Sequence, residues 1–498
     1  MVRSPAASQG QPSPAPALKP SKGAGGGFGA RSAVLLLALL WPAQLLTAAG
    51  VMTSTAQAEV AQHFHTTQIA WFVLIYTLVG VLLTPFAAKF GDIYGKKRVM
   101  LVITAIGLVG DVIAALAPTY ELMLIGRGIA AGYAPIAALV FATSREVFPR
   151  KQVGPASGII GGSGAFVAAA SPLIAGWLLD SFGFHGVLWF LVLATAIALV
   201  LLFAFVPETP RRAADGQFDW PGGLLLGGSV TALIYGIGQG TAWGWTDLRT
   251  LGLLAGSGVG LIAFVLVEKR VAHPLLDVRM MSRRSVATVL ASSSVLAGSA
   301  IAGASVMSVV VALYPRIPGV SDGLGWSATH SAVVGIPTGI MALLAGFTAG
   351  WLTGRADPRL PWLIGGTLAT LGLILQGLFH HNELQVIAAG MVSGMGLGMV
   401  MACTPILLMG AVSPQEQSMT SGMSIMLQGL ANAIATQVTF VVLNRNSTVV
   451  DGTTFYQDAG YRNAYFALAA CAGIGLLVSL LIPKLLRPTE IEAGAAAI

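Results

Sequence analysis

Long apolar segments alternate with short polar ones along almost the whole chain. A helix of about 20 mainly apolar residues crosses a hydrocarbon core of about 30 Å. Fourteen such stretches lie at approximately residues 32–54, 67–88, 99–117, 120–141, 154–179, 186–206, 221–240, 250–267, 286–314, 329–353, 361–379, 384–410, 418–444 and 463–483. The pattern therefore predicts an all-α integral membrane protein with fourteen spans.

Composition and charge agree with this prediction. Of 498 residues, 55% are hydrophobic and only 9% are charged, against about 25% charged in soluble domains. A net charge of +7 is compatible with nucleic-acid binding, but inner loops of membrane proteins also collect Lys and Arg. With the amino terminus inside, 22 of the 27 basic residues fall in inner segments and four in outer loops. We therefore expect a multi-pass protein of the plasma (inner) membrane, with both termini cytoplasmic and no nucleic-acid partner.

The spans fall into a plan of six, two and six helices. Residues 1–30 are expected to be a disordered cytoplasmic tail, since they lack the apolar content to fold alone. The predicted units that follow are an N-terminal six-helix bundle (31–207), a linker with two extra transmembrane helices (208–285), a C-terminal six-helix bundle (286–485) and a cytoplasmic tail (486–498).

A charge-dense turn, GDIYGKKR, joins the second and third spans. Gly91 and Gly95 allow a tight turn, Asp92 can support the next helix, and Lys96, Lys97 and Arg98 prefer the cytoplasmic side. With Ala88 and Phe90, the stretch resembles the loop between helices 2 and 3 of the major facilitator superfamily, although Ala88 replaces the usual first glycine. The resemblance implies that this loop governs conversion between access states, with Glu208 of VPETPRR, Asp92, Lys96, Arg98 and Arg145 forming an inner latch.

The fifth span is rich in small residues. Gly158, Pro172 and Gly176 match the signature of helix 5 in the antiporters of that superfamily. The positions where the signature has glycine are occupied here by Val167, Ser171 and Ala175. Ordinary small-residue packing between helices is the alternative interpretation.

Two charged residues fall inside spans. Arg127 in LIGRGIAAG resembles the family's helix 4 Arg, which is linked to proton transfer, and Asp111 lies in LVGDVIAALAP. Counted from Pro118, both lie at similar depth, roughly 10 Å below the outer surface. We expect an ion pair that couples transport to protons, with a purely structural Arg as the alternative.

Polar and aromatic residues on three spans are candidates for a substrate pocket. They are Trp41, Gln44, Trp71, Tyr76, Gln428 and Asn432, with Gln437 on the same stripe. Bonds between helices and simple packing explain the same pattern.

By its resemblance to the fourteen-span drug:proton antiporters, the chain is expected to be a secondary active transporter. It would export small amphipathic compounds, such as a drug or antibiotic, by proton antiport with alternating access. One departure is that residues 32–58 contain no acid, where that family has an Asp in helix 1. A proton-independent facilitator or importer, or a non-transporting membrane sensor, remain as alternatives.

No enzymatic chemistry is indicated. The seven His residues are scattered without metal-ligand spacing, no nucleophile triad is present, and the two Cys lie in apolar runs. We expect no catalytic residues, no cofactor and no metal. The expected partners are a small-molecule substrate, protons and the lipid bilayer. We expect the protein to be a monomer.

Overall fold

The computed structural model describes residues 29–209, 219–271, 278–353, 355, 357–412, 417–451 and 453–483. The expected tails, 1–30 and 486–498, lie outside the described residues except for Gly29 and Ala30. Parts of the expected linker, 210–218 and 272–277, lie outside them too.

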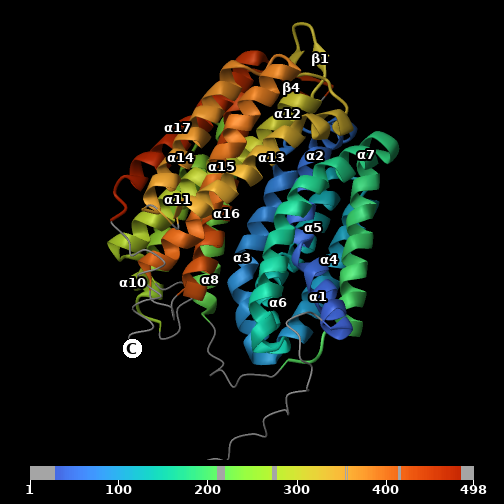
Figure 1. The fold of residues 1–498 in the computed structure, drawn as a ribbon. Coiled ribbons are helices and arrows are strands. Elements are labelled where there is room, and N and C mark those ends of the chain that lie inside the picture. The colour runs from blue at the N-terminus through green and yellow to red at the C-terminus, as the bar shows by residue number, and fades with distance from the viewer. Residues whose placement is uncertain are drawn as a thin grey trace, which may run out of the picture.

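The first half of the chain forms one group of packed helices, drawn blue to green in Figure 1. Its elements are α1 (Ala30–Ala43), α2 (Leu45–His63), α3 (Ala70–Tyr94), α4 (Lys96–Leu116), α5 (Tyr120–Ala130), the 3₁₀ turn η1 (Ala131–Tyr133), α6 (Ile136–Val147) and α7 (Arg150–Phe205). The length of α7 is interrupted at Gly183, where φ is 66° and ψ is −172°. Two expected spans, 154–179 and 186–206, therefore meet at this bend, which lies at the top of Figure 1.

The second half forms another group, drawn yellow to red. Its elements are α11 (Arg284–Ala302), the π-helical turn η2 (Gly303–Met307), α12 (Ser308–Leu313), α13 (Ala328–Thr353), α14 (Arg359–Leu378), α15 (Glu383–Ala411), α16 (Gln417–Asn444) and α17 (Asp458–Ser479). Between the halves come α8 (Trp220–Trp243), α9 (Leu248–Glu268) and the short α10 (Val278–Met281), with α8 beside α16.

Two short antiparallel hairpins lie at one end of the molecule, the top of Figure 1, called the hairpin end below. One pairs β1 (Arg316–Ile317) with β2 (Ser321–Asp322), and the other pairs β3 (Ser447–Val450) with β4 (Thr453–Tyr456). The opposite end carries the α3–α4 turn and is called the loop end.

Twelve helical segments of the described chain are long and apolar enough to cross a membrane. One of them, Phe166–Phe205, contains the Gly183 bend, and α3 adds a shorter apolar stretch, Ala70–Thr84. The all-α membrane fold is confirmed, while the count of fourteen spans stays a prediction.

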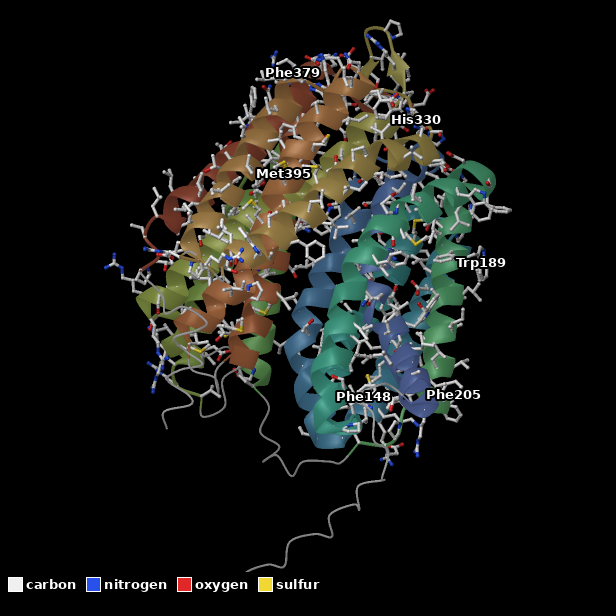
Figure 2. All side chains as sticks on the ribbon, viewed as in Figure 1. Phe148, Trp189, Phe205, His330, Phe379 and Met395 are labelled. Carbon is white, nitrogen blue, oxygen red and sulfur yellow. The ribbon has the colours of Figure 1, made fainter. Side chains whose placement is uncertain are left out.

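The outside of the helix bundle is apolar, as a bilayer requires. Trp189 and Phe205 project from α7 with 46% and 49% of their surface exposed (Figure 2). Arg127, Asp111 and Gln57, in contrast, are buried. Apolar side chains outside and polar or ionisable ones inside reverse the usual arrangement of a water-soluble protein.

Candidate functional site

The candidate site lies where α4 crosses α5. A Cβ added to Gly110 would overlap the backbone of Ala130, and one added to Gly126 would lie 2.5 Å from the backbone nitrogen of Ala114. The two helices therefore approach backbone to backbone, as small residues permit in lipid. Asp111 and Arg127 follow these glycines directly in sequence, so the crossing places them at one level of the core.

Asp111 is 2% exposed and accepts a hydrogen bond of 2.8 Å from Oγ1 of Thr195 on α7. Arg127 is fully buried, and its Nη2 donates to Oγ1 of Thr53 on α2 over 3.2 Å. The guanidinium lies 4.4 Å from the centre of the Tyr76 ring, an arrangement in which the ring face attracts the cation. Asp111 thus has a partner on α7, and Arg127 has one on α2.

The expected direct ion pair is not formed, because within the described chain no salt bridge joins Asp111 to Arg127. The Arg127 side chain turns instead toward Tyr76 and Phe72 on α3, and its Nε and Nη1 have no hydrogen-bond partner. Both groups nevertheless lie in the buried core, where weak screening lengthens the reach of a charge.

Two of the pocket candidates, Trp41 on α1 and Gln44 directly after it, form hydrogen bonds with α7. Nε1 of Trp41 donates to the Ala194 carbonyl over 2.9 Å. Nε2 of Gln44 donates to the Ile160 carbonyl over 3.0 Å and to Oγ of Ser163 over 2.8 Å. Both side chains therefore join helices of the first half by hydrogen bonds.

The other four candidates lie apart from these two. Trp71 packs on Tyr235 of α8 with ring centroids 5.6 Å apart, and Tyr76 faces Arg127. Gln428 donates to Ser424 one turn earlier on α16, while Oδ1 of Asn432 is buried without a hydrogen-bond partner. Gln437, from the same stripe, is buried on α16 as well. The six candidates are not brought together into one pocket in the described part of the chain.

A large apolar cavity lies between the added helices and the second half. Its volume is about 550 Å³, and it is lined by α8, α9, α10, α11 and α16 through residues such as Val230, Phe264, Met426 and Leu430. Ser282 and Ser294 are its polar lining. Its lining on α16 includes residues next to Gln428 and Asn432 but not these two side chains, which stay candidates.

The α3–α4 turn has the backbone that its glycines allow. Gly95 joins the helices at φ 94° and ψ 132°, and a Cβ at Gly91 would lie 2.6 Å from the Leu139 side chain. Nε of Arg98 lies 3.8 Å from Oε2 of Glu208, both side chains being exposed. One contact between the turn and the chain that follows α7 is therefore a weak surface ion pair.

Other members of the expected latch are arranged differently. Lys96 forms a buried ion pair with Glu146 of α6, and its backbone nitrogen donates to Oγ1 of Thr209 over 2.8 Å. The side chains of Asp92 and Arg145 lie outside the described residues. Glu146 is an additional partner that the sequence pattern did not indicate.

The small-residue span on α7 contacts the second half of the chain. A Cβ at Gly176 would lie 2.7 Å from the backbone nitrogen of Thr329. One turn later, the Asp180 carboxylate accepts from the backbone nitrogens of Ala328 and Thr329 over 3.1 Å and 3.0 Å. Pro172 lies within α7, and the side-chain surroundings of Gly158 lie outside the described residues. Gly176 therefore belongs to an interface between the two halves at the hairpin end.

Several contributing residues had no signal in the sequence. Thr53 and Thr195 are single hydroxyls within apolar spans, and their partners lie 74 and 84 residues away. Glu59 lies just beyond the acid-free stretch, and its Oε1 accepts from the backbone nitrogen of Phe184 over 3.2 Å at the Gly183 bend. Glu59 and Asp180 stand out in the sequence as acids at the ends of apolar spans. Their hydrogen-bond partners could be identified only from the structure.

Two packed helical groups, an apolar exterior and buried ionisable residues define a multi-pass membrane protein. The family model of the Major Facilitator Superfamily matches residues 40–436. The chain belongs to that superfamily, and it is not an enzyme.

Relatives and solved structures agree with this assignment. The chain is 26% identical over 384 residues to "Multidrug resistance protein Stp" of Mycobacterium tuberculosis, covering 75% of this chain and 68% of that protein. It is 28% identical over 411 residues to "Multidrug resistance protein B homolog" of the same species, covering 79% and 72%.

Among solved structures, a bacterial homolog to the human lysosomal transporter Spinster superposes with a TM-score of 0.59 at 15% identity, covering 92% of this chain and 99% of that one. A POT family transporter in complex with 5-aminolevulinic acid gives 0.63 at 15% identity, covering 90% and 94%. These likenesses show a shared fold.

Proposed function

We propose that the chain is a drug:proton antiporter of fourteen spans that exports small amphipathic compounds from the cell. The observation that carries the proposal is a buried acid, Asp111, beside a buried Arg127 in a protein whose relatives are named as multidrug resistance proteins. A carboxyl group in such a core is able to hold or release a proton as its surroundings change.

The apolar cavity between α8, α9 and α16 supports the substrate class. At about 550 Å³ it is of the size that holds a drug-sized molecule, and its lining offers apolar surface with two serine hydroxyls. A hydrophobic or amphipathic compound therefore suits it better than a sugar or an ion.

Alternating access is supported by the contacts between halves. At the hairpin end, Asp180 binds the start of α13, and Gly176 fits closely against Thr329. At the loop end, Arg98 forms an ion pair with Glu208, which directly follows the first half of the chain, so this contact does not connect the two halves. Close contacts of this kind at the hairpin end suit a transporter that opens toward the other end.

The sequence is also the basis of the proposed oligomeric state, orientation and domain bounds. The protein works as a monomer in the plasma membrane with both termini cytoplasmic, and its bundles are residues 31–207 and 286–485, separated by the linker 208–285. The basic inner loops favour this orientation.

The test is transport into inverted membrane vesicles or proteoliposomes that contain the purified full-length chain. An imposed proton gradient should drive accumulation of a cationic amphipathic dye, and a protonophore should abolish it. Uphill accumulation that persists with the protonophore would exclude proton coupling. Movement only down the substrate gradient would identify a facilitator, and no movement of any amphipathic compound tested would contradict export of this class.

A further inference from the structure

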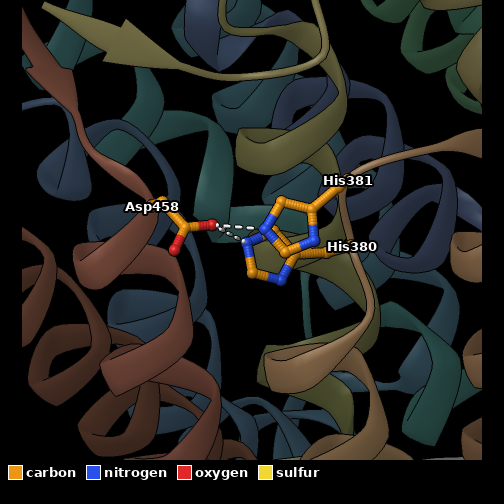
Figure 3. Close-up of side chains that lie close together, drawn as sticks. All are labelled: His380, His381 and Asp458. Carbon is orange, nitrogen blue, oxygen red and sulfur yellow. Dashed lines mark hydrogen bonds and ion pairs between the residues drawn. The ribbon is translucent and has the colours of Figure 1, made fainter. Parts of the chain in front are cut away.

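Three side chains from distant parts of the sequence meet at the hairpin end (Figure 3). His380 and His381 follow α14, and Asp458 is the first residue of α17. Oδ1 of Asp458 lies 3.1 Å from Nε2 of His380 and 2.8 Å from Nε2 of His381. The two rings stack 4.5 Å apart at 20°, so both Nε2 atoms point at the same carboxylate.

The hydrogen bonds fix the tautomer of His380. Its Nδ1 lies 3.0 Å from the carbonyl oxygen of Gln376, and a carbonyl oxygen only accepts, so Nδ1 carries the hydrogen. In the neutral ring, Nε2 is then a lone pair directed at a carboxylate oxygen. Nε2 lies 3.1 Å from Oδ1 of Asp458, a separation that a proton on Nε2 or a cation shared by the two groups makes favourable.

This nitrogen is deeply buried. His380 is 4% exposed, and its Nε2 has no hydrogen-bond partner, whereas His381 next to it donates to Asp458. A buried acceptor without a donor costs free energy, and a cation shared with the carboxylate removes that cost.

We propose that His380, His381 and Asp458 bind a divalent transition-metal ion of the zinc class. Two imidazole nitrogens and one carboxylate oxygen are a ligand set that zinc accepts at about 2.0–2.2 Å. The three ligand atoms lie within 4.8 Å of one another, and ligands at such bond lengths around a tetrahedral ion are separated by roughly 3.4 Å. An imidazole binds a metal in the plane of its own ring, so admitting the ion requires the stacked His381 ring, whose side chain is 57% exposed, to turn, together with small shifts in the two short contacts.

Groups behind the ligands hold them in this orientation. The Gln376 carbonyl orients the His380 ring, which is the usual role of a carbonyl behind a metal-binding imidazole. The backbone nitrogen of Asp458 donates to Oδ2 of Asp322 over 2.9 Å, which fixes the start of α17 beside β2. On metal binding the His381 proton moves from Nε2 to Nδ1, which faces water because this side chain is 57% exposed.

The fourth position is left for water, on the exposed side of His381 and Asp458. A bound ion joins the turn between α14 and α15 to the first residue of α17. The site is therefore a metal clamp within the second half, separate from Asp111 and from the apolar cavity.

The test uses the purified full-length protein in detergent, treated with EDTA and passed through gel filtration. Zinc binding is followed by isothermal titration calorimetry, bound metal by elemental analysis, and Co²⁺ substitution by visible absorption. The wild type should bind one zinc per chain, with a tetrahedral Co²⁺ spectrum and a raised unfolding temperature. His381→Asn and Asp458→Asn should each weaken binding more than about tenfold.

His330→Asn is the matched control, because His330 also faces a carboxylate, Glu383, at 3.4 Å but has no third ligand. It should bind zinc like the wild type. His381 is exposed, so His381→Asn decides the question even if Asp458→Asn fails to fold. Wild-type protein without stoichiometric zinc, wild-type affinity in His381→Asn, or equal loss in His330→Asn would each refute the site. None of these readouts depends on transport.

Discussion

A buried guanidinium without a carboxylate at contact distance is the central residue-scale feature. Arg127 is stabilised by the Tyr76 and Phe72 rings and by one hydroxyl, from Thr53. Ring faces and hydroxyls are weaker partners than a carboxylate. The arrangement therefore leaves Asp111 free to change protonation without breaking a direct ion pair, which a proton carrier needs.

We predict that Asp111→Asn abolishes gradient-driven accumulation of substrate and leaves substrate exchange intact. The amide keeps the shape and can still accept from Thr195, but it carries no exchangeable carboxyl proton. Accumulation and counterflow exchange in proteoliposomes, measured on the same preparation, separate the two activities. Normal expression with undiminished uphill transport would assign the proton to another residue.

Thr104→Val is the matched control for this substitution. Thr104 lies on the same helix, is fully buried, and its Oγ1 has no hydrogen-bond partner. Valine has nearly the same shape, so expression and transport should stay within about twofold of wild type, since a neutral change in stability is expected when an unsatisfied hydroxyl is removed.

At this scale the sequence predicts depth better than it predicts partners. Counting residues from Pro118 correctly placed Asp111 and Arg127 at one level, because helix rise is constant. Rotation about the helix axes decides which groups touch, and packing of α2, α3 and α7 sets that rotation. Thr53, Tyr76 and Thr195 could not be chosen from the sequence for this reason.

At the scale of elements, the α3–α4 turn depends on a glycine. Gly95 at φ 94° and ψ 132° occupies a region that side chains with a Cβ rarely adopt. We predict that Gly95→Ala costs about 1–3 kcal/mol of local strain. Thermal unfolding in detergent should show a lowered midpoint, and transport should fall strongly because the turn holds Lys96 and Arg98 in place.

Gly252→Ala on α9 is the control for the turn. Gly252 is helical and a Cβ there meets nothing within 4 Å, so alanine should hold or raise stability. Equal unfolding midpoints for the two variants would show that the turn tolerates a side chain.

The bend in α7 is an element-scale feature held by a side chain from α2. We predict that Glu59→Ala destabilises the protein by about 1–3 kcal/mol, because it leaves the Phe184 N–H without its acceptor. Glu59→Gln keeps an oxygen at that place and should restore most of the loss. Thermal unfolding midpoints compare the two, and an unchanged midpoint for Glu59→Ala would mean that water or another group satisfies the amide.

Element positions were largely readable from hydropathy, because lipid selects long apolar helices. The bend at Gly183 was expected as a loop between two spans, and the structure makes it a single residue of non-helical backbone within α7. The sequence also indicated α16 as a helix that lines a cavity. The residues it indicated there, Gln428 and Asn432, are not among those that line the apolar cavity. Burial of one face depends on α8 and α9, whose contacts with α16 lie beyond any local pattern.

For the whole molecule, orientation in the membrane follows from the placement of basic residues and is open to direct test. We predict that Val449→Cys in the β3–β4 hairpin reacts with an impermeant thiol reagent in intact cells, while Tyr94→Cys at the α3–α4 turn does not. Both side chains are well exposed, at 57% and 59%, so access to the reagent differs only by membrane side.

The labelling is done with Cys403 and Cys471 replaced by alanine, which leaves one thiol per variant. Permeabilised cells supply the positive control, in which both introduced thiols should react. Labelling of Tyr94→Cys from outside would reverse the proposed topology.

The contact of Asp180 with α13 has a consequence for how this protein tolerates sequence change. The carboxylate binds the backbone N–H groups of residues 328 and 329, which every amino acid except proline supplies. A saturation library should therefore accept most residues at 329, reject proline there, and accept few at 180. Over evolutionary time such a contact allows the side chains at the start of α13 to change while Asp180 is conserved.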